Sequence, residues 1–227
     1  MQSLTGSLAF CTKALPPGKT FNRPLYGSFK NVSKLHHFIR LTKWIREDLQ
    51  MWQLFLQEFN GYCYIQDLEW ESSSNLHLLT DSAGGKSLEC GAYLDGSWAF
   101  LRWSEHWDQI ILNDITYLEI VPVALAICIW KNKFQNKKII FNCDNMAVVS
   151  ILNNKSSKND RVMSLFRKIA YSTLMSHFQF KATNIASSEN KIADALSRGQ
   201  FQRFREVPKC AEERPHQKPQ EFLEFLI

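Results

Sequence analysis

Three short runs of alternating side chains lie between residues 76 and 103, and they restrict the possible folds more than any other feature of the chain. The second and third runs, residues 87–94 and 97–103, are separated by Asp95-Gly96, a pair that favours a two-residue hairpin turn. The first run ends at Asp81-Ser82-Ala83-Gly84-Gly85, which is typical of a tight turn. The region is therefore predicted to begin with three antiparallel strands.

A helix is predicted after these strands, with Asn113 or Asp114 as its N-cap. Apolar residues recur along it at helical spacing: Leu118, Val121, Leu125 and Ile129. Pro122 lies inside this helix, where a proline removes one backbone hydrogen bond at a cost of about 3 kcal/mol. We therefore expect a kink or a break near Pro122.

The rest of this region alternates strand and helix. The predicted strands are residues 138–143 and 178–185, and the predicted helices are 146–152, 160–175 and 189–197. A right-handed crossover through the first helix would place the strand before Asp144 parallel to the strand that ends at Asp81. This order predicts an α/β fold with a mixed five-stranded sheet covered by helices.

The chain is predicted to divide at the polar segment Glu71-Ser72-Ser73-Ser74. Residues 1–70 are predicted to be mainly helical, because the apolar residues between positions 32 and 59 follow a 3.6-residue period. Residues 75–199 would form the α/β domain. Residues 200–227 combine charged residues with prolines, which predicts a flexible tail.

The composition limits the class of protein. An apolar content of 45% is enough for a buried core, and the net charge of +5 favours nucleic acid only weakly. The longest apolar run, residues 120–130, is too short to cross a bilayer, and the N-terminus lacks the features of a signal peptide. The six cysteines form no CxxC pair, so neither a disulfide framework nor a zinc site is indicated. We expect a soluble protein of the cytoplasm or nucleus with no membrane partner.

Four acidic residues stand on separate predicted elements: Asp81, Glu119, Asp144 and Asp194. Two of them end neighbouring strands, one lies on the crossing helix and one on the last helix. Carboxylates that are packed together repel each other unless a cation compensates their charge. Oxygen ligands favour Mg²⁺, with Mn²⁺ as the other possibility, and two such ions can promote phosphodiester cleavage. The four acids are therefore candidate metal ligands and catalytic residues.

Each acid also has a simpler explanation. Asp81 can form the turn that follows it, Asp144-Asn145 can cap the next helix, and Asp194 can be a surface residue. Glu119 is flanked by apolar residues, where an unpaired carboxylate is costly. Turn formation, helix capping or surface exposure can explain a single acid. These explanations account less well for four acids that occur in this order.

The segments around the acids are Leu79-Thr80-Asp81-Ser82-Ala83, Tyr117-Leu118-Glu119-Ile120-Val121-Pro122, Phe141-Asn142-Cys143-Asp144-Asn145-Met146-Ala147-Val148-Val149 and Asn190-Lys191-Ile192-Ala193-Asp194-Ala195-Leu196-Ser197-Arg198. Together they resemble the ribonuclease H domain of retrotransposon polymerases. The resemblance implies a ribonuclease H-like fold that hydrolyses the RNA strand of an RNA/DNA hybrid. It also implies that Asp81, Glu119, Asp144 and Asp194 bind two Mg²⁺ ions.

Resemblances outside this domain concern the rest of such a polymerase. Leu4-Thr5-Gly6-Ser7-Leu8-Ala9-Phe10, with Pro16-Pro17-Gly18, resembles the end of a reverse transcriptase thumb and connection, which implies an original covalent link to the palm and fingers. No Tyr-x-Asp-Asp motif is present, so we expect no DNA synthesis. Phe201-Gln202-Arg203-Phe204-Arg205 resembles elements that encode a tyrosine recombinase downstream.

A basic cluster is the candidate contact with phosphates, and it consists of Lys155, Lys158, Arg161, Arg167 and Lys168. A solvated helix face is the alternative explanation. Ser82 and Asn145, beside the acids, are candidate nucleic-acid contacts, although turn formation explains them equally well. The resemblance implies that the specificity for a hybrid comes from the ribose 2′-hydroxyl groups of one strand and the backbone shape of the other.

One segment departs from the family pattern. Related elements carry a His-x-Pro-Gly-like loop before the last helix, where this chain has Asn184-Ile185-Ala186-Ser187. The departure favours an alternative function, a catalytically inactive or weak nucleic-acid-binding remnant of a retroelement. A transposase-like or integrase-like fold is a third hypothesis, but those folds place their acids in a different order.

Overall fold

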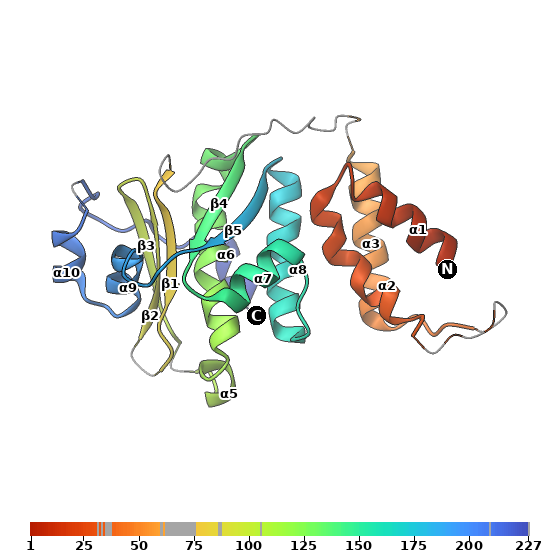
Figure 1. The fold of residues 1–227 in the computed structure, drawn as a ribbon, viewed down its shortest axis with the longest axis horizontal. Coiled ribbons are helices and arrows are strands. Elements are labelled where there is room, and N and C mark those ends of the chain that lie inside the picture. Colours follow the sequence, from red (N-terminus) through yellow and green to blue (C-terminus); the bar gives the residue numbers. More distant parts are fainter. Residues whose placement is uncertain are drawn as a thin grey trace. The chain divides into compact units, whose positions relative to one another are not determined.

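The structure is a computed structural model that describes residues 1–30, 32, 34, 38–59, 61, 76–85, 88–104, 106–208 and 210–226. The chain forms two compact units, Met1–Leu68 and Glu69–Ile227. The predicted division at residues 71–74 lies outside the described residues. In the described part, the first unit is helical and the second contains a sheet (Figure 1).

Short helices surround a small aromatic core in the first unit. Its elements are α1 (Gln2–Cys11), the 3-10 helix η1 (Pro16–Asn22), α2 (Arg23–Gly27) and α3 (Lys43–Gln57). Phe55 of α3 makes edge-to-face contacts with Phe21 and Trp52, and all three rings are buried. The indole nitrogen of Trp52 donates a hydrogen bond to Asn22 Oδ1 at 2.9 Å.

The helix predicted between positions 32 and 59 is wrong at its start, because α3 begins only at Lys43. Thr42 has an extended backbone (ψ 165°), and its hydroxyl accepts a hydrogen bond from the N–H of Ile45 at 3.4 Å, which is N-cap geometry. Phe38, one of the apolar residues that suggested the longer helix, is fully exposed. The 3.6-residue spacing of apolar residues therefore includes positions before Lys43 that are neither helical nor buried, such as Phe38.

A mixed five-stranded sheet in the order β3-β2-β1-β4-β5 forms the centre of the second unit. The strands are β1 (Leu78–Ser82), β2 (Glu89–Leu94), β3 (Ser97–Arg102), β4 (Lys138–Cys143) and β5 (Gln179–Asn184). β1, β2 and β3 are antiparallel neighbours, whereas β4 runs parallel to both β1 and β5. The predicted α/β fold and the parallel pairing of β1 with β4 are confirmed.

The predicted hairpin is also present. Asp95 and Gly96 join β2 to β3, and both have positive φ angles, 51° and 95°. Positive φ at both central residues is characteristic of the type I′ turn, which matches the twist of two antiparallel strands. The turn chemistry of these two residues therefore sets the register of the hairpin.

Helices cover both faces of the sheet (Figure 1). α6 (Ile115–Phe134) packs on β1, β2 and α8 (Asp160–Met175), and together with α7 (Met146–Asn154) it encloses the main hydrophobic core. α9 (Lys191–Ser197) and α10 (Phe201–Glu206) pack in a second cluster. Neighbouring residues of β2 belong to different clusters, so the two clusters lie on opposite faces.

α6 is the central helix of this unit, and the four-residue helix α5 (Gln109–Leu112) precedes it. Asp114 caps α6 as predicted, because its side chain accepts a hydrogen bond from the N–H of Tyr117 at 3.1 Å. The helix continues through Pro122 without a break. By length and composition α6 could span a membrane (mean hydropathy 1.4), but 67% of its apolar window is buried in the fold. A core helix therefore accounts for its apolar composition.

The composition of residues 200–227 predicts a flexible tail, whereas the structure places two helices there, α10 and α11 (Gln220–Leu226). Phe204 of α10 and Phe222 of α11 are fully buried. Between the helices, backbone N–H groups donate to carbonyls at the edge of the sheet: Glu212 to Gly96 (3.0 Å) and His216 to Trp98 (2.8 Å). The segment therefore covers part of the edge strand β3.

Candidate metal centre

Two of the predicted acids stand at the ends of neighbouring parallel strands. β1 and β4 pair with Leu79 opposite Asn142, so Asp81 and Asp144 each lie two residues further along the chain. The Asn142 side chain links the strands by donating a hydrogen bond to the carbonyl of Leu78 at 3.0 Å. Because the carboxyl ends of parallel strands meet at the same edge of a sheet, Asp81 and Asp144 emerge together.

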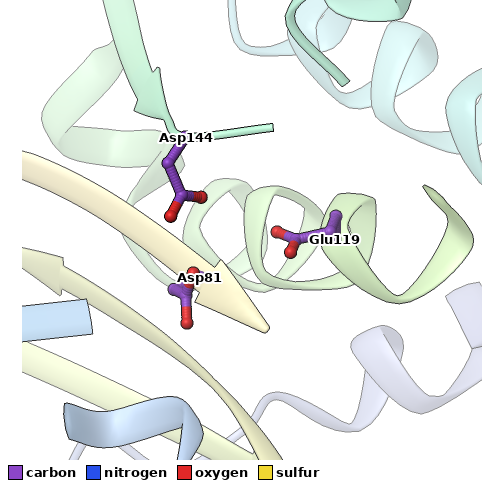
Figure 2. Close-up of side chains that lie close together, drawn as sticks. All are labelled: Asp81, Glu119 and Asp144. Atoms are coloured by element: carbon purple, nitrogen blue, oxygen red, sulfur yellow. The ribbon is translucent and has the colours of Figure 1, made fainter. Parts of the chain in front are cut away.

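Glu119 joins these two acids from α6 (Figure 2). One carboxylate oxygen from each of Asp81, Glu119 and Asp144 lies within 4.8 Å of the other two. Asp81 is buried, with 6% of its surface exposed, whereas Glu119 and Asp144 are partly buried. Within the described part of the chain, these three residues form a cluster that could hold a metal ion.

Burial raises the pKa of two of these carboxyl groups. The pKa of Glu119 rises from 4.5 to about 9, first because of burial and then because of repulsion from Asp81 and Asp144. The pKa of Asp81 rises from 3.8 to about 7, again mainly because of burial. Interactions with Ser82 and Ser197 oppose these two shifts only in part. At neutral pH the cluster therefore binds protons unless a cation compensates the carboxylates.

The chemistry of the donors suits a hard divalent cation. The ligand atoms of the cluster are carboxylate oxygens, which favour Mg²⁺ or Mn²⁺ over metals that prefer thiolates or imidazoles. A cation at this position would offset the repulsion that raises the pKa values of Glu119 and Asp81. The three acids therefore fit a divalent metal ion.

We expect the free energy of unfolding of the metal-free protein to fall as the pH rises from 4.5 towards 9. The folded-state pKa values of Glu119 and Asp81 lie above those of the unfolded chain, so the folded state holds protons that the unfolded state releases. This stabilisation is complete below the unfolded-state values and is lost as the pH passes about 7 for Asp81 and about 9 for Glu119. Urea unfolding in the presence of a chelator measures the profile, and a profile that rises over this range contradicts the raised pKa values.

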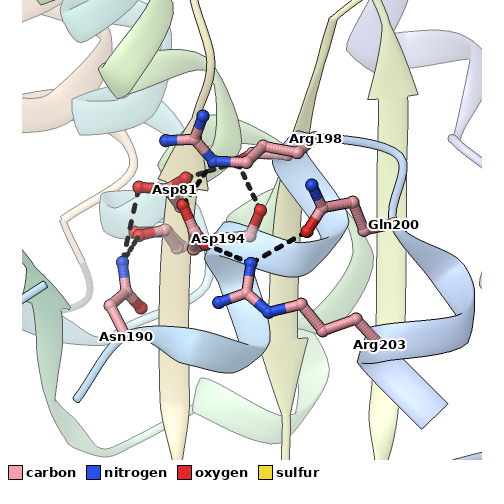
Figure 3. A network of polar contacts seen from close by, with 8 residues as sticks. Asp81, Asn190, Asp194, Arg198, Gln200 and Arg203 are labelled. Atoms are coloured by element: carbon pink, nitrogen blue, oxygen red, sulfur yellow. Dashed lines mark hydrogen bonds and ion pairs between the residues drawn. The ribbon is translucent and has the colours of Figure 1, made fainter. Parts of the chain in front are cut away.

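Two buried residues at the two ends of α9 orient Asp81 (Figure 3). Ser197 Oγ donates a hydrogen bond to Asp81 Oδ2 at 2.5 Å, and Asn190 Nδ2 lies 3.5 Å from Asp81 Oδ1. The same amide nitrogen donates to the carbonyl of Thr80 at 3.1 Å. Because Ser197 and Asn190 are fully buried, the packing of α9 on the sheet fixes the direction of the Asp81 carboxylate.

Asp194 lies near Asp81 but pairs with arginines (Figure 3). Its Oδ1 accepts a hydrogen bond from Arg198 Nε at 2.6 Å, and its Oδ2 accepts one from Arg203 Nη1 at 2.8 Å. Partial burial raises the pKa of Asp194, but the two arginines outweigh burial, and the net pKa is lowered. Asp194 is still close enough to raise the pKa of Asp81. The structure therefore groups three of the four predicted acids and holds the fourth next to them.

Asn145 and Ser82, the predicted nucleic-acid contacts next to the acids, differ in how their side chains are used. Asn145 caps α7, because its Oδ1 accepts hydrogen bonds from the N–H groups of Ala147 (2.9 Å) and Val148 (3.3 Å). The buried Ser82 hydroxyl has no hydrogen bond of ordinary geometry in the described part of the chain, although it lies near enough to Glu119 to lower the pKa of that carboxyl. Ser82 therefore retains hydrogen-bonding capacity beside the cluster.

Lys155, the first member of the predicted basic cluster, has a structural role. It ends α7 with a left-handed backbone (φ 56°). Its ammonium group donates to the carbonyls of Leu152 (3.2 Å) and Phe180 (3.1 Å) and lies 3.7 Å from the centre of the Phe180 ring. These contacts tie the end of α7 to β5.

The other basic residues of that cluster differ in their exposure. Lys158 is exposed in the connection between α7 and α8. Arg161 is partly exposed and pairs with Asp114 at 3.5 Å. Arg167 and Lys168 are partly buried and have partners within the protein. Lys158 and Arg161 therefore remain the better placed candidates for phosphate contacts.

Several residues around the acids have roles that the sequence analysis did not assign. Asn190, Ser197 and Arg198 belong to the segment that carried the resemblance. Asn190 and Ser197 are buried, but Asn190 lies between the exposed residues Glu189 and Lys191, so the burial of its side chain has no local signal in the sequence. Arg203 lies outside that segment, on α10. No local pattern connects Arg203 with Asp194, so this pair becomes visible only in three dimensions.

Part of the second unit is similar to a known protein family. Residues 123–199 match the family described as reverse transcriptase-like. The matched region includes β4, β5 and α9, and therefore Asp144 and Asp194, whereas Asp81 and Glu119 precede it. A comparison with curated proteins gave no match. The mixed sheet, its strand order and its covering helices form an α/β fold of the ribonuclease H-like class.

Proposed function

We propose that this chain hydrolyses the RNA strand of RNA/DNA hybrids in a metal-dependent reaction, as the ribonuclease H part of a retrotransposon polymerase. The observation that carries the proposal is the convergence of Asp81, Glu119 and Asp144 from three separate elements on a ribonuclease H-like fold. The match of residues 123–199 to a reverse transcriptase-like family supports the same class of enzyme.

The residues around the site divide into ligands and positioning residues. Asp81, Glu119 and Asp144 would hold divalent cations, two Mg²⁺ ions with Mn²⁺ as an alternative. By the sequence resemblance, Asp194 would complete the ligand set. Such ions, when bound, activate the attacking water and stabilise the leaving oxygen of the phosphodiester. Ser197 would keep the Asp81 carboxylate in a fixed direction, which lowers the cost of organising the site for catalysis.

The proposal also assigns contacts with the substrate to residues outside the acidic cluster. Lys158 and Arg161 would contact phosphates. The Ser82 hydroxyl is buried, so it would act on the Glu119 carboxyl and would not touch the nucleic acid directly. Discrimination between RNA and DNA would depend on the ribose 2′-hydroxyl group, without reading of the base sequence. An RNA/DNA hybrid is therefore the proposed partner.

Incubation of the purified full chain with an RNA/DNA hybrid labelled on the RNA strand tests this function. We expect internal cuts in the RNA and an intact DNA strand when Mg²⁺ or Mn²⁺ is present, and no cuts when a chelator removes the metal, because carboxylates alone do not activate water sufficiently. Double-stranded DNA and double-stranded RNA serve as matched substrates. A hybrid that stays intact with either metal, under conditions where a control enzyme cuts it, contradicts the proposal.

A noncatalytic nucleic-acid-binding remnant is the second candidate function, and the pairing of Asp194 with Arg198 and Arg203 favours it. In that case the protein would bind the hybrid without cutting it. Gel-shift measurements made beside the cleavage assay separate the two functions, since binding without cleavage in both metals supports the remnant.

The origin of the chain is part of the same proposal and rests on the sequence resemblances. Residues 1–70 would derive from the end of a reverse transcriptase thumb and connection, once linked to the palm and fingers. The segment Phe201-Gln202-Arg203-Phe204-Arg205 would place the element among those that encode a tyrosine recombinase. The reaction would take place in the cytoplasm or nucleus.

A further inference from the structure

Both oxygens of the Asp194 carboxylate are occupied by arginines from different helices (Figure 3). Arg198 lies four residues further along the chain and belongs to the end of α9, so the geometry of one helix brings it to Asp194. Arg203 belongs to α10 and reaches the same carboxylate across the turn between the two helices. Its Nη1 also donates to Gln200 Oε1 at 2.9 Å. The contact from Arg203 therefore depends on where α10 is placed.

The placement of α10 is fixed by packing. Gly199 has a left-handed backbone (φ 64°) and makes the turn between α9 and α10. Phe204, the residue after Arg203, is fully buried, with its ring centre 4.8 Å from that of Trp98 and 6.4 Å from that of Tyr93. α10 thus presents Arg203 to Asp194 from a packed position on the sheet.

The ion pairs on Asp194 can be exchanged for other partners. The side chains of Arg198 and Arg203 are 53% and 43% exposed, so either guanidinium group can move into water at small cost. Asp194 also lies close enough to the acidic cluster to interact with Asp81. A divalent cation in the cluster and the guanidinium of Arg203 would therefore attract the same carboxylate and repel each other.

We propose that Arg203 is a positioning residue that holds Asp194 out of the metal site, so that a cation gains its fourth acid only by displacing this arginine. The inference rests on the proposed function, because the proposed function is what assigns Asp194 to the metal ligands. It predicts that Arg203 lowers the affinity of the site for metal, whereas a residue that merely supports the fold would raise it. Arg203 thereby couples the position of α10 to the binding of metal.

Titration of Mn²⁺ into the full chain, followed by calorimetry without nucleic acid, tests the proposal. Arg203→Ala is expected to bind Mn²⁺ about two- to fivefold more tightly than the wild type, the range expected for the loss of one partly exposed ion pair. Lys191→Ala is the matched control, because it removes one positive charge from an exposed position three residues before Asp194 on the same helix. The control is expected to gain less affinity, and both variants should keep the melting temperature of the wild type.

A double-mutant cycle then shows whether the effect passes through Asp194. In a chain that carries Asp194→Asn, the additional change Arg203→Ala should no longer increase the affinity for Mn²⁺. An equal gain in Lys191→Ala, an unchanged or weaker affinity in Arg203→Ala, or a gain that persists with Asp194→Asn overturns the inference. If the folded wild type and all variants bind no Mn²⁺, the proposed metal-dependent function itself is contradicted, and the inference falls with it.

Discussion

Asp144→Asn is expected to reduce hybrid cleavage on the order of a thousandfold or more while leaving hybrid binding unchanged. Asp144 contributes one of the three clustered carboxylates, and an amide neither carries the charge nor binds a divalent cation as strongly. The fold should tolerate the change, because Asp144 helps to raise the pKa values of Asp81 and Glu119 by repulsion. Single-turnover cleavage rates, gel-shift affinity and thermal melting measure these three quantities.

Asp95→Asn is the matched control for this experiment. It makes the same chemical change in the β2–β3 turn, at the end of the hairpin opposite to Asp81, and asparagine adopts a positive φ readily before glycine. Its cleavage rate should equal that of the wild type. Residual cleavage by Asp144→Asn at a rate close to the wild-type rate is the result that would remove Asp144 from the proposed site.

Gly91→Ala is expected to destabilise the second unit by about 2 kcal/mol or more and to slow cleavage by about a hundredfold. Gly91 lies opposite Asp81 in the β1–β2 pairing, under α9. A Cβ atom there would come within 2.3 Å of Leu196 Cβ and within 3.3 Å of the backbone nitrogen of Ser197. These atoms belong to the helix backbone or lie next to it, so α9 itself must shift, together with Ser197 and Asp194. Urea unfolding and the cleavage rate measure the two effects.

Gly84→Ala provides the comparison within the same unit. A Cβ atom at Gly84 would meet Ile115 Cδ1 at 2.6 Å, but this atom is the tip of a flexible side chain on a residue that is 48% exposed. The side chain of Ile115 can rotate away, so we expect a clearly smaller loss of stability than for Gly91→Ala. Equal losses in the two variants would show that the close packing of α9 on Gly91 does not control the site.

Much of the sheet could be predicted because its signals are local. The two-residue alternation and the Asp95-Gly96 pair specified β1, β2 and β3, and the handedness of crossovers then placed β4 beside β1. The meeting of Asp81 and Asp144 followed from this topology, since both residues end parallel neighbours. Glu119 was predictable because a carboxylate between buried apolar residues needs a compensating partner.

Elements that depend on distant partners were not predictable in the same way. The composition around α10 and α11 indicated a tail, yet Phe204 and Phe222 are buried against parts of the chain far away in sequence. Conversely, the apolar period before α3 suggested helix where Thr42 caps the helix and Phe38 remains in solvent. Local periodicity shows which side of a segment is apolar, but burial of that side depends on whether another surface lies opposite to it.

The sequence by itself determined the order of the five strands and of the helices between them, and it determined that Asp81, Glu119 and Asp144 converge, because alternation, turn chemistry and crossover handedness act along the chain. Only the tertiary structure decided the partners of Asp194. That carboxylate stands between an acidic cluster and two arginines, and electrostatic energy falls with distance in space and not with separation in sequence. The position of α10, fixed by the burial of Phe204, brings Arg203 within 2.8 Å of Asp194.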